Sequence, residues 1–101
     1  MRRAAKVDAN QPDIVAALRR MGATVQPLHS VGQGCPDLLA GWKGINLLIE
    51  VKDGNKPPSA RKLTSDQEQW HRDWRGSVYV VETVGQAIAL LMALGEINAE
   101  A

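Results

Sequence analysis

With 101 residues, this chain has room for a single folded domain, and its 45% hydrophobic content is enough to form a modest apolar core. The 23% of charged residues balance to a net charge of +1, a composition that excludes wholesale disorder. No apolar stretch reaches the roughly 18–20 residues that a membrane span needs, and the basic N-terminus lacks the apolar run of a secretory signal.

The charges are unevenly distributed along the chain. All 12 Lys and Arg fall within residues 1–75, against 8 acidic residues before residue 82, which leaves a surplus of four positive charges there. This surplus permits a polyanionic partner without requiring one, since a solvated surface would have the same composition. The single cysteine, Cys35, cannot form an internal disulfide, so we expect a semi-buried thiol in a reducing cytoplasm rather than a nucleophile.

Residues 1–9 are expected to form a flexible N-terminal arm, and residues 10–101 a single domain. Asn10 can cap a first helix, because its side chain can accept a hydrogen bond from a free amide of the first turn. Apolar residues at helical spacing follow, and Gly22 is expected to end this helix. Residues 23–28 then predict a short strand.

The next segment predicts a β-hairpin. A glycine-rich bend over residues 31–36 precedes the short apolar run 38–40, and residues 41–44 carry a turn signal. The following stretch, residues 45–52, is dense in residues that favour strands.

The last third predicts a helix, a strand and a helix. After a polar loop over residues 53–63, Thr64 and Gln67 form a capping-box pattern that begins a helix running to about Trp74. Residues 77–81 predict a strand, and the last helix is expected to be capped by Thr83 with Gln86 and to run through Leu94. The order helix, three strands, helix, strand, helix indicates an α/β fold with one mixed sheet flanked by helices.

The hairpin brings acidic side chains together. Period-2 alternation over residues 45–52 places Glu50 and Lys52 on the same face of their strand. If the turn is centred on residues 43–44, the numbers of cross-strand partners sum to 87, which sets Asp37 directly opposite Glu50. A three-residue turn would break this pairing unless a bulge restored it.

Two carboxylates that face each other repel, and a divalent cation converts that repulsion into chelation. Oxygen ligands favour Mg²⁺, or Mn²⁺ in its place. With Lys52 beside the ion, Asp37 and Glu50 suit phosphodiester hydrolysis, because the metal activates water and neutralises phosphate charge. The alternative is that Asp37 is only a turn residue, and Glu50 with Lys52 an edge-strand ion pair.

These residues resemble the PD-(D/E)XK nuclease superfamily, with Pro36-Asp37 followed by Glu50-Val51-Lys52. The tighter resemblance is to its VRR-NUC branch, in the small stand-alone form found in phages. The pattern of that branch is matched by an ordered set of segments: Gly34-Cys35-Pro36-Asp37-Leu38-Leu39, Ile49-Glu50-Val51-Lys52 and Gln67. The resemblance extends over nearly the whole chain.

The resemblance implies a restriction endonuclease-like core, α-β-β-β-α-β-α, with a four-stranded mixed sheet. It implies a metal ion held by Asp37, Glu50 and the main-chain carbonyl of Val51, with Lys52 and Gln67 completing the catalytic site. Family members often carry a glutamate in the first helix. This chain has Asp13 at that place, so a metal role for Asp13, direct or through water, is left open beside a helix-dipole role.

The resemblance also implies an activity: Mg²⁺-dependent cleavage of branched DNA such as Holliday junctions, with Mn²⁺ as a possible substitute, by a homodimer. A bacterial cytoplasm is the expected location, for a bacterial or a phage-encoded protein. Two alternatives remain open, a non-catalytic DNA-binding scaffold of the same fold and a nuclease that acts on RNA or linear DNA.

The polar loop and the helix after it supply further candidates. The loop carries Lys56, Arg61 and Lys62, which are candidate DNA phosphate contacts or simply solvated charges. Gln67 can serve the site or only cap its helix, and tryptophans 70 and 74 on the same helical face are expected to pack on the sheet and turn Gln67 inward. His71 is expected on the exposed side of this helix.

Three apolar residues have two possible roles each. Trp42, at the hairpin tip, can wedge into a junction or pack in the interior. The apolar last helix is expected to belong to the core, although Leu91 and Leu94 could instead contribute to a dimer interface.

Overall fold

The structure is a computed structural model that describes residues 7–100, with side chains described for residues 7–97. The first six residues of the expected arm therefore lie outside the described residues. The helices and strands follow the predicted order, with one added 3₁₀ helix η1 in the polar loop: α1 (Gln11–Arg20), β1 (Thr24–Pro27), β2 (Leu38–Trp42), β3 (Ile45–Val51), η1 (Pro58–Ala60), α2 (Ser65–Asp73), β4 (Val78–Val81) and α3 (Val84–Glu100).

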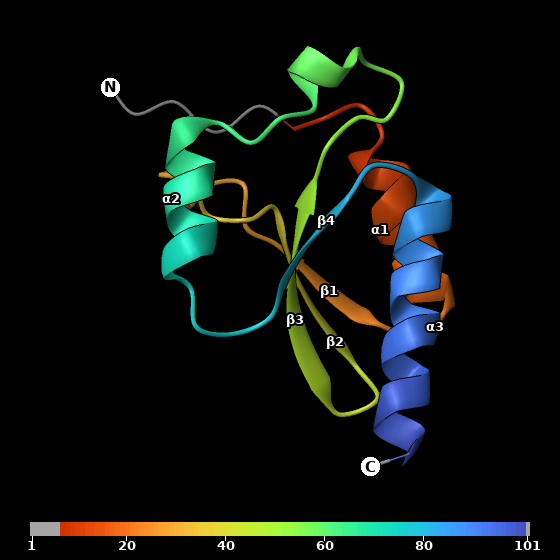
Figure 1. Ribbon diagram of the computed structural model, residues 1–101. Coiled ribbons are helices and arrows are strands. Elements are labelled where there is room, and N and C mark those ends of the chain that lie inside the picture. The colour runs from red at the N-terminus through yellow and green to blue at the C-terminus, as the bar shows by residue number, and fades with distance from the viewer. Residues whose placement is uncertain (1–6, 101) are drawn as a thin grey trace.

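The four strands form one mixed sheet in the order β1-β2-β3-β4. The first three strands pair antiparallel, and β4 lies parallel to β3 after the α2 crossover. Figure 1 shows α2 on one side of the sheet and α1 and α3 side by side on the other. The predicted α/β fold, a four-stranded mixed sheet flanked by helices, is confirmed.

The hairpin between β2 and β3 has the predicted register. Trp42 pairs with Ile45 and Leu38 with Ile49, so partner numbers sum to 87. The two turn residues, Lys43 and Gly44, have φ angles of 47° and 80°, as expected for the two-residue turns that match strand twist. With this two-residue loop, side chains at paired positions of β2 and β3 point to the same side of the sheet, as predicted.

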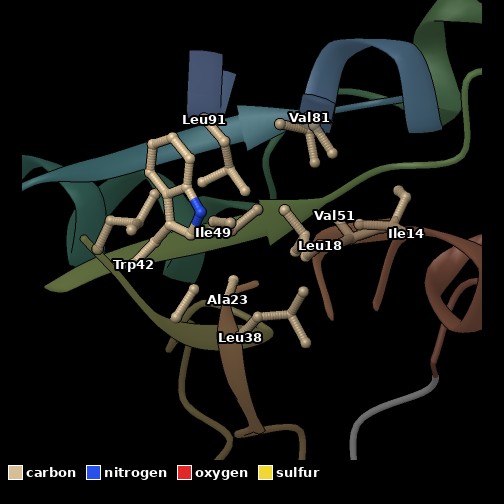
Figure 2. Close-up of a cluster of buried hydrophobic side chains, with 12 residues drawn as sticks. Ile14, Leu18, Ala23, Leu38, Trp42, Ile49, Val51, Val81 and Leu91 are labelled. Carbon is tan, nitrogen blue, oxygen red and sulfur yellow. The ribbon is translucent and has the colours of Figure 1, made fainter. Parts of the chain in front are cut away.

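The hydrophobic core lies between the sheet and the helices α1 and α3 (Figure 2). On β3, every second residue points into it, so that Leu47, Ile49 and Val51 are each at most 1% exposed. Leu18 from α1 and Leu91 from α3 are fully buried against this face. Removal of these side chains from water is the main favourable contribution to stability.

The start of α1 differs from the expectation. Asn10 occupies the N-cap position, but within the described chain its side chain makes no capping hydrogen bond. Its Nδ2 instead donates to the main-chain oxygens of Lys52 and Glu82, each at 3.0 Å. The side chain of Asn10 thus bonds to main-chain carbonyls at the ends of β3 and β4 instead of capping α1. It thereby links the start of α1 to both strands.

Trp42 packs in the interior rather than projecting from the hairpin tip. It is 8% exposed, and its Nε1 donates to the main-chain oxygen of Met21 at 3.1 Å. A Cβ added at Gly95 of α3 would lie only 2.7 Å from its Cη2 atom, so the indole lies directly against the α3 backbone. The buried position of this ring leaves packing as its role.

Helix α3 begins as predicted and ends later. Gln86 N donates to Thr83 Oγ1 at 3.0 Å, which confirms the expected cap, but the helix continues to Glu100 rather than stopping near Leu94. Leu91 is fully buried and therefore belongs to the core, whereas Leu94 is half-buried. Among the described helices, none combines the length and apolarity needed to cross a membrane.

Candidate functional site

A polar pocket of about 240 Å³ lies on the α2 side of the sheet. Its walls come from the glycine-rich bend before β2, the end of β3 and the start of α2. Asp37, Glu50, Lys52 and Gln67, four residues that the sequence singled out, all line it. The fold therefore brings together side chains from three segments that are distant in the sequence.

Asp37 and Glu50 face each other, as the register predicted. Asp37 directly precedes β2, and its Oδ2 accepts a hydrogen bond of 2.7 Å from the main-chain N of Val51. Glu50 is only 1% exposed. Burial, a hydrogen bond with Asp37 and the negative charge of Asp37 raise the pKa of Glu50 from 4.5 to about 9, against the opposing charge of Lys52.

Gln67 connects the other groups of the pocket. Its Oε1 accepts from Lys52 Nζ at 2.7 Å and from Thr64 N at 2.9 Å, while its Nε2 donates to Glu50 Oε2 at 3.2 Å. The two roles weighed for this residue are therefore compatible, because one amide completes the capping box and also bridges the acid to the lysine. Lys52 is 8% exposed, so its ammonium is confined to the pocket.

Gly34 explains how α2 comes so close to the acidic pair. Its φ of +83° is unfavourable for residues with a side chain. A Cβ at this position would lie 2.6 Å from the carbonyl carbon of Asp66, in the first turn of α2. Because Gly34, the glycine of the Gly-x-Pro-Asp pattern, has no side chain, the first turn of α2 can lie against its backbone and bring Gln67 to the pocket.

The donor set fits a hard divalent cation. Glu50 Oε1 is buried and has no hydrogen-bond partner among the described residues, so it keeps a lone pair for a cation even if one neighbouring N–H group donates to it. Residues 7–100 hold no cluster of three or more His, Cys, Asp or Glu side chains suited to a metal. Two carboxylates and a main-chain carbonyl such as that of Val51 leave several positions for water, which is the usual coordination of Mg²⁺ in proteins.

The structure does not bring Asp13 to this pocket. Asp13 is exposed in the first turn of α1, a helix whose buried face carries Ile14 and Leu18 toward the core. Asp8, which sequence reasoning did not single out, lines the pocket instead and contributes to the raised pKa of Glu50. Because Asp8 lies three residues before the helix, helical spacing gave no signal for it.

His71 was wrongly expected on the exposed side of α2. Its side chain is 13% exposed, and its Nε2 lies 3.6 Å from Glu50 Oε1. Burial and the charge of Lys52 lower the pKa of His71. The signal was present in the sequence, since His71 follows Gln67 by four residues and such residues share a helix face.

The tryptophans of α2 pack less deeply than expected. Trp70 and Trp74 stack with ring centroids 4.7 Å apart, but Trp74 is 47% exposed. The helix ends at Asp73, and Trp74 already has an extended backbone. The inward orientation of Gln67 therefore comes from its polar contacts rather than from burial of both indoles.

The three basic residues of the polar loop do not line the described pocket. Lys56 Nζ pairs with Asp8 Oδ1 at 3.2 Å, and Arg61 pairs with Glu82 at 3.3 Å. Lys62 is exposed. Their role as DNA contacts stays a prediction, and two of them already neutralise nearby carboxylates.

Cys35 lines the pocket as a half-buried free thiol. Burial, with the charges of Glu50 and Asp37, raises its pKa. A thiol held protonated in this way is a poor nucleophile, which agrees with the expectation from sequence.

Comparison with known proteins points to one family. No family model and no curated relative matches the sequence. A solved structure described as a VRR_NUC domain is 28% identical, with a TM-score of 0.61, over 81% of this chain and 89% of that one. VRR_NUC domains are nuclease-type domains, so the fold, the ordered motif and the acidic pocket agree.

Proposed function

This chain belongs to the VRR-NUC family of nuclease-type domains, and on that basis we propose that it is a Mg²⁺-dependent DNA endonuclease that cleaves branched DNA such as four-way junctions. The observation that carries the proposal is the shared pocket of Asp37, Glu50 and Lys52. A sheet that served only as a scaffold would gain nothing from burying two facing carboxylates, because their repulsion lowers stability.

Asp37, Glu50 and the main-chain carbonyl of Val51 are the proposed metal ligands. Asp37 is held by the amide of Val51, and Glu50 by the amide of Gln67, so both carboxylates have fixed directions. A bound Mg²⁺ would lower the pKa of a water molecule and neutralise phosphate charge. The protein contributes the orientation of the acids and a confined space around them.

Lys52 is proposed to act on the phosphate and the attacking water. Its ammonium shares the pocket with the acids and is held by Gln67 Oε1 at 2.7 Å, which restricts its rotation. A positive charge that is already positioned stabilises the negative charge that develops on phosphate oxygens during hydrolysis. Gln67 aligns Lys52 with Glu50 and is therefore included in the proposed site.

Branched DNA and a homodimer are the proposed substrate and assembly. The surplus of four positive charges before residue 82 suits a polyanion. Two copies related by a two-fold axis would present two pockets to a symmetric junction, which allows paired cuts by a chain of only 101 residues. Lys56, Arg61 and Lys62 remain candidate phosphate contacts outside the pocket.

The proposal is tested by incubating the purified protein with a four-way junction, a flap, a linear duplex and RNA, with Mg²⁺ and with EDTA. We expect cutting of the junction that requires the metal. Asp37→Asn, Glu50→Gln and Lys52→Ala are each expected to reduce the rate by at least about 10²-fold, the loss typical for a group that stabilises transition-state charge. Circular dichroism of each variant should match the parent.

Arg20→Ala is a suitable control, because this arginine is exposed and outside the pocket. It should keep the cleavage rate at saturating DNA. Binding of the junction without any metal-dependent cutting would identify a scaffold and refute the proposal. If RNA or linear duplex were cut faster than the junction, the proposed hydrolysis would stand, but the proposed substrate would be wrong.

A further inference from the structure

Helix α2 presents a second polar side chain to Glu50, one turn beyond Gln67. His71 Nε2 lies 3.6 Å from Glu50 Oε1, with the two side chains 13% and 2% exposed. Residues four apart on a helix share a face, so Gln67 and His71 approach the same carboxylate from consecutive turns. The proposed catalytic mechanism makes no use of His71.

The two oxygens of Glu50 have different partners. Oε2 accepts a hydrogen bond of 3.2 Å from Gln67 Nε2. Oε1 and His71 Nε2 are both buried, and each is without a hydrogen-bond partner in the part of the chain that the structure describes. Their separation exceeds a hydrogen bond by only a few tenths of an ångström, so a small side-chain rotation pairs two atoms that burial otherwise leaves unsatisfied.

The surroundings of His71 restrict where its ring can move. Trp70 meets the imidazole edge-on, with centroids 6.3 Å apart and an interplanar angle of 73°. The capping box at Thr64 anchors the first turn of the same helix. The cap orders the helix and Trp70 borders one edge of the ring, and in this arrangement His71 Nε2 has Glu50 as an acceptor within reach.

We propose that His71 is a positioning residue that, together with Gln67, grips the two oxygens of Glu50 and fixes the direction in which this carboxylate meets a divalent cation. The inference rests on the proposed function, since it assigns Glu50 to a metal. Groups that hydrogen-bond to a ligating carboxylate typically change metal affinity 10- to 100-fold when they are removed. A role in packing alone predicts no such change.

The test compares two replacements of His71 in the full chain. His71→Leu fills the space without an N–H group, whereas His71→Gln carries an amide nitrogen at nearly the reach of Nε2. Mn²⁺ binding without DNA, followed by electron paramagnetic resonance, should weaken at least about 10-fold in His71→Leu and recover to within about 3-fold in His71→Gln. With a junction substrate, kcat should fall in His71→Leu while the KM for DNA stays unchanged.

Glu68→Ala is the matched control, because Glu68 is exposed on the same helix and lies outside the pocket. It should bind Mn²⁺ as the parent does. If His71→Leu does not fold, His71→Asn replaces it, since its shorter side chain does not reach Glu50, and weaker Mn²⁺ binding than His71→Gln is then expected.

Parental Mn²⁺ affinity in His71→Leu, or in His71→Asn, would overturn the inference and leave the proposed function intact. A parent protein that bound no Mn²⁺ and cut no DNA would overturn both. An equal loss in His71→Leu and His71→Gln would also overturn it, because the amide donor would then have failed to replace the imidazole.

Discussion

The two faces of the sheet are built on opposite principles. Helices α1 and α3 cover one face, where Leu18, Ile49 and Leu91 are fully buried in an apolar cluster. Helix α2 covers the other face, and none of its described residues is fully buried. Its contacts are polar instead, and they converge on the buried acid Glu50.

Strand β3 serves both faces at once. Ile49 and Val51 point into the core, while Glu50 between them points into the pocket. The apolar face supplies the free energy that offsets the cost of burying a carboxylate beside a second one. The comparison indicates that stability comes mainly from one side of the sheet, whereas the proposed chemistry lies on the other side. Three measurements test this division.

The largest effect on stability is expected in the core. Leu91→Ala removes a fully buried side chain from α3, so we expect a loss of about 2–5 kcal/mol in the free energy of unfolding. Urea denaturation measures this loss. Cleavage per folded molecule at 25 °C should be unchanged, because Leu91 lies on the face away from the pocket. If Leu91→Ala reduced cleavage and left the unfolding curve unchanged, the two faces of the sheet would not have separate roles.

A smaller effect should separate the two roles of Gln67. Thr64→Ala removes the side-chain cap of α2 and leaves the contacts of Gln67 to Lys52 and Glu50, so we expect a loss of about 0.5–2 kcal/mol and cleavage within a few-fold of the parent. Gln67→Ala removes the same capping box and also the contacts to Lys52 and Glu50. It should lower stability by a similar amount and cleavage about 10- to 100-fold, the range for groups that orient a metal ligand. Cleavage rates are measured on a junction with Mg²⁺. Equal rates for the two variants would show that Gln67 only caps α2.

The smallest effect concerns pH without metal. Glu50 has a folded pKa of about 9, above its ordinary value of 4.5. Folding therefore favours the protonated acid, a contribution that is complete below pH 4.5 and is lost as pH rises toward 9. In EDTA, the melting temperature of Glu50→Gln should exceed that of the parent by a margin that widens between pH 5 and pH 9.

Added Mg²⁺ should raise the parent's melting temperature at pH 8 and narrow this margin, because the ion binds the ionised carboxylate. His71, whose pKa is lowered from its ordinary value of 6.5, destabilises the folded state as pH falls below 6.5. Both proteins carry this histidine, so the difference between their melting temperatures is used, and it is read most directly from pH 7 to pH 9. If the melting temperatures of the parent and Glu50→Gln changed in parallel with pH across this range, burial of Glu50 would not destabilise the folded protein.

Local patterns predicted the parts of the site that lie on neighbouring strands. The two-residue turn at Lys43 and Gly44 and the alternation along β3 were enough to place Asp37 opposite Glu50. The capping box at Thr64 was equally visible. These features depend on residues close in the sequence, so their geometry follows from backbone periodicity.

The failures of prediction involve groups whose partners are distant in the chain. Asn10 was expected to cap α1, but the free carbonyls of β3 and β4 take its amide. His71 was expected to face solvent; its spacing from Gln67 indicated a shared helix face, but the contact of that face with Glu50 depends on how α2 crosses the sheet. Asp8, rather than Asp13, reaches the pocket because of the path of the chain before α1.

The amino-acid sequence by itself determined the order of the elements, the hairpin register and the pairing of two acids with a lysine. These depend on periods of 2 and 3.6 residues and on turn chemistry, which act over a few residues. Only the tertiary structure decided that α2 docks through Gly34 and that Gln67 and His71 approach the two oxygens of Glu50 from consecutive turns. Such contacts depend on how segments far apart in the chain pack together. The periodicity of nearby residues does not determine this packing.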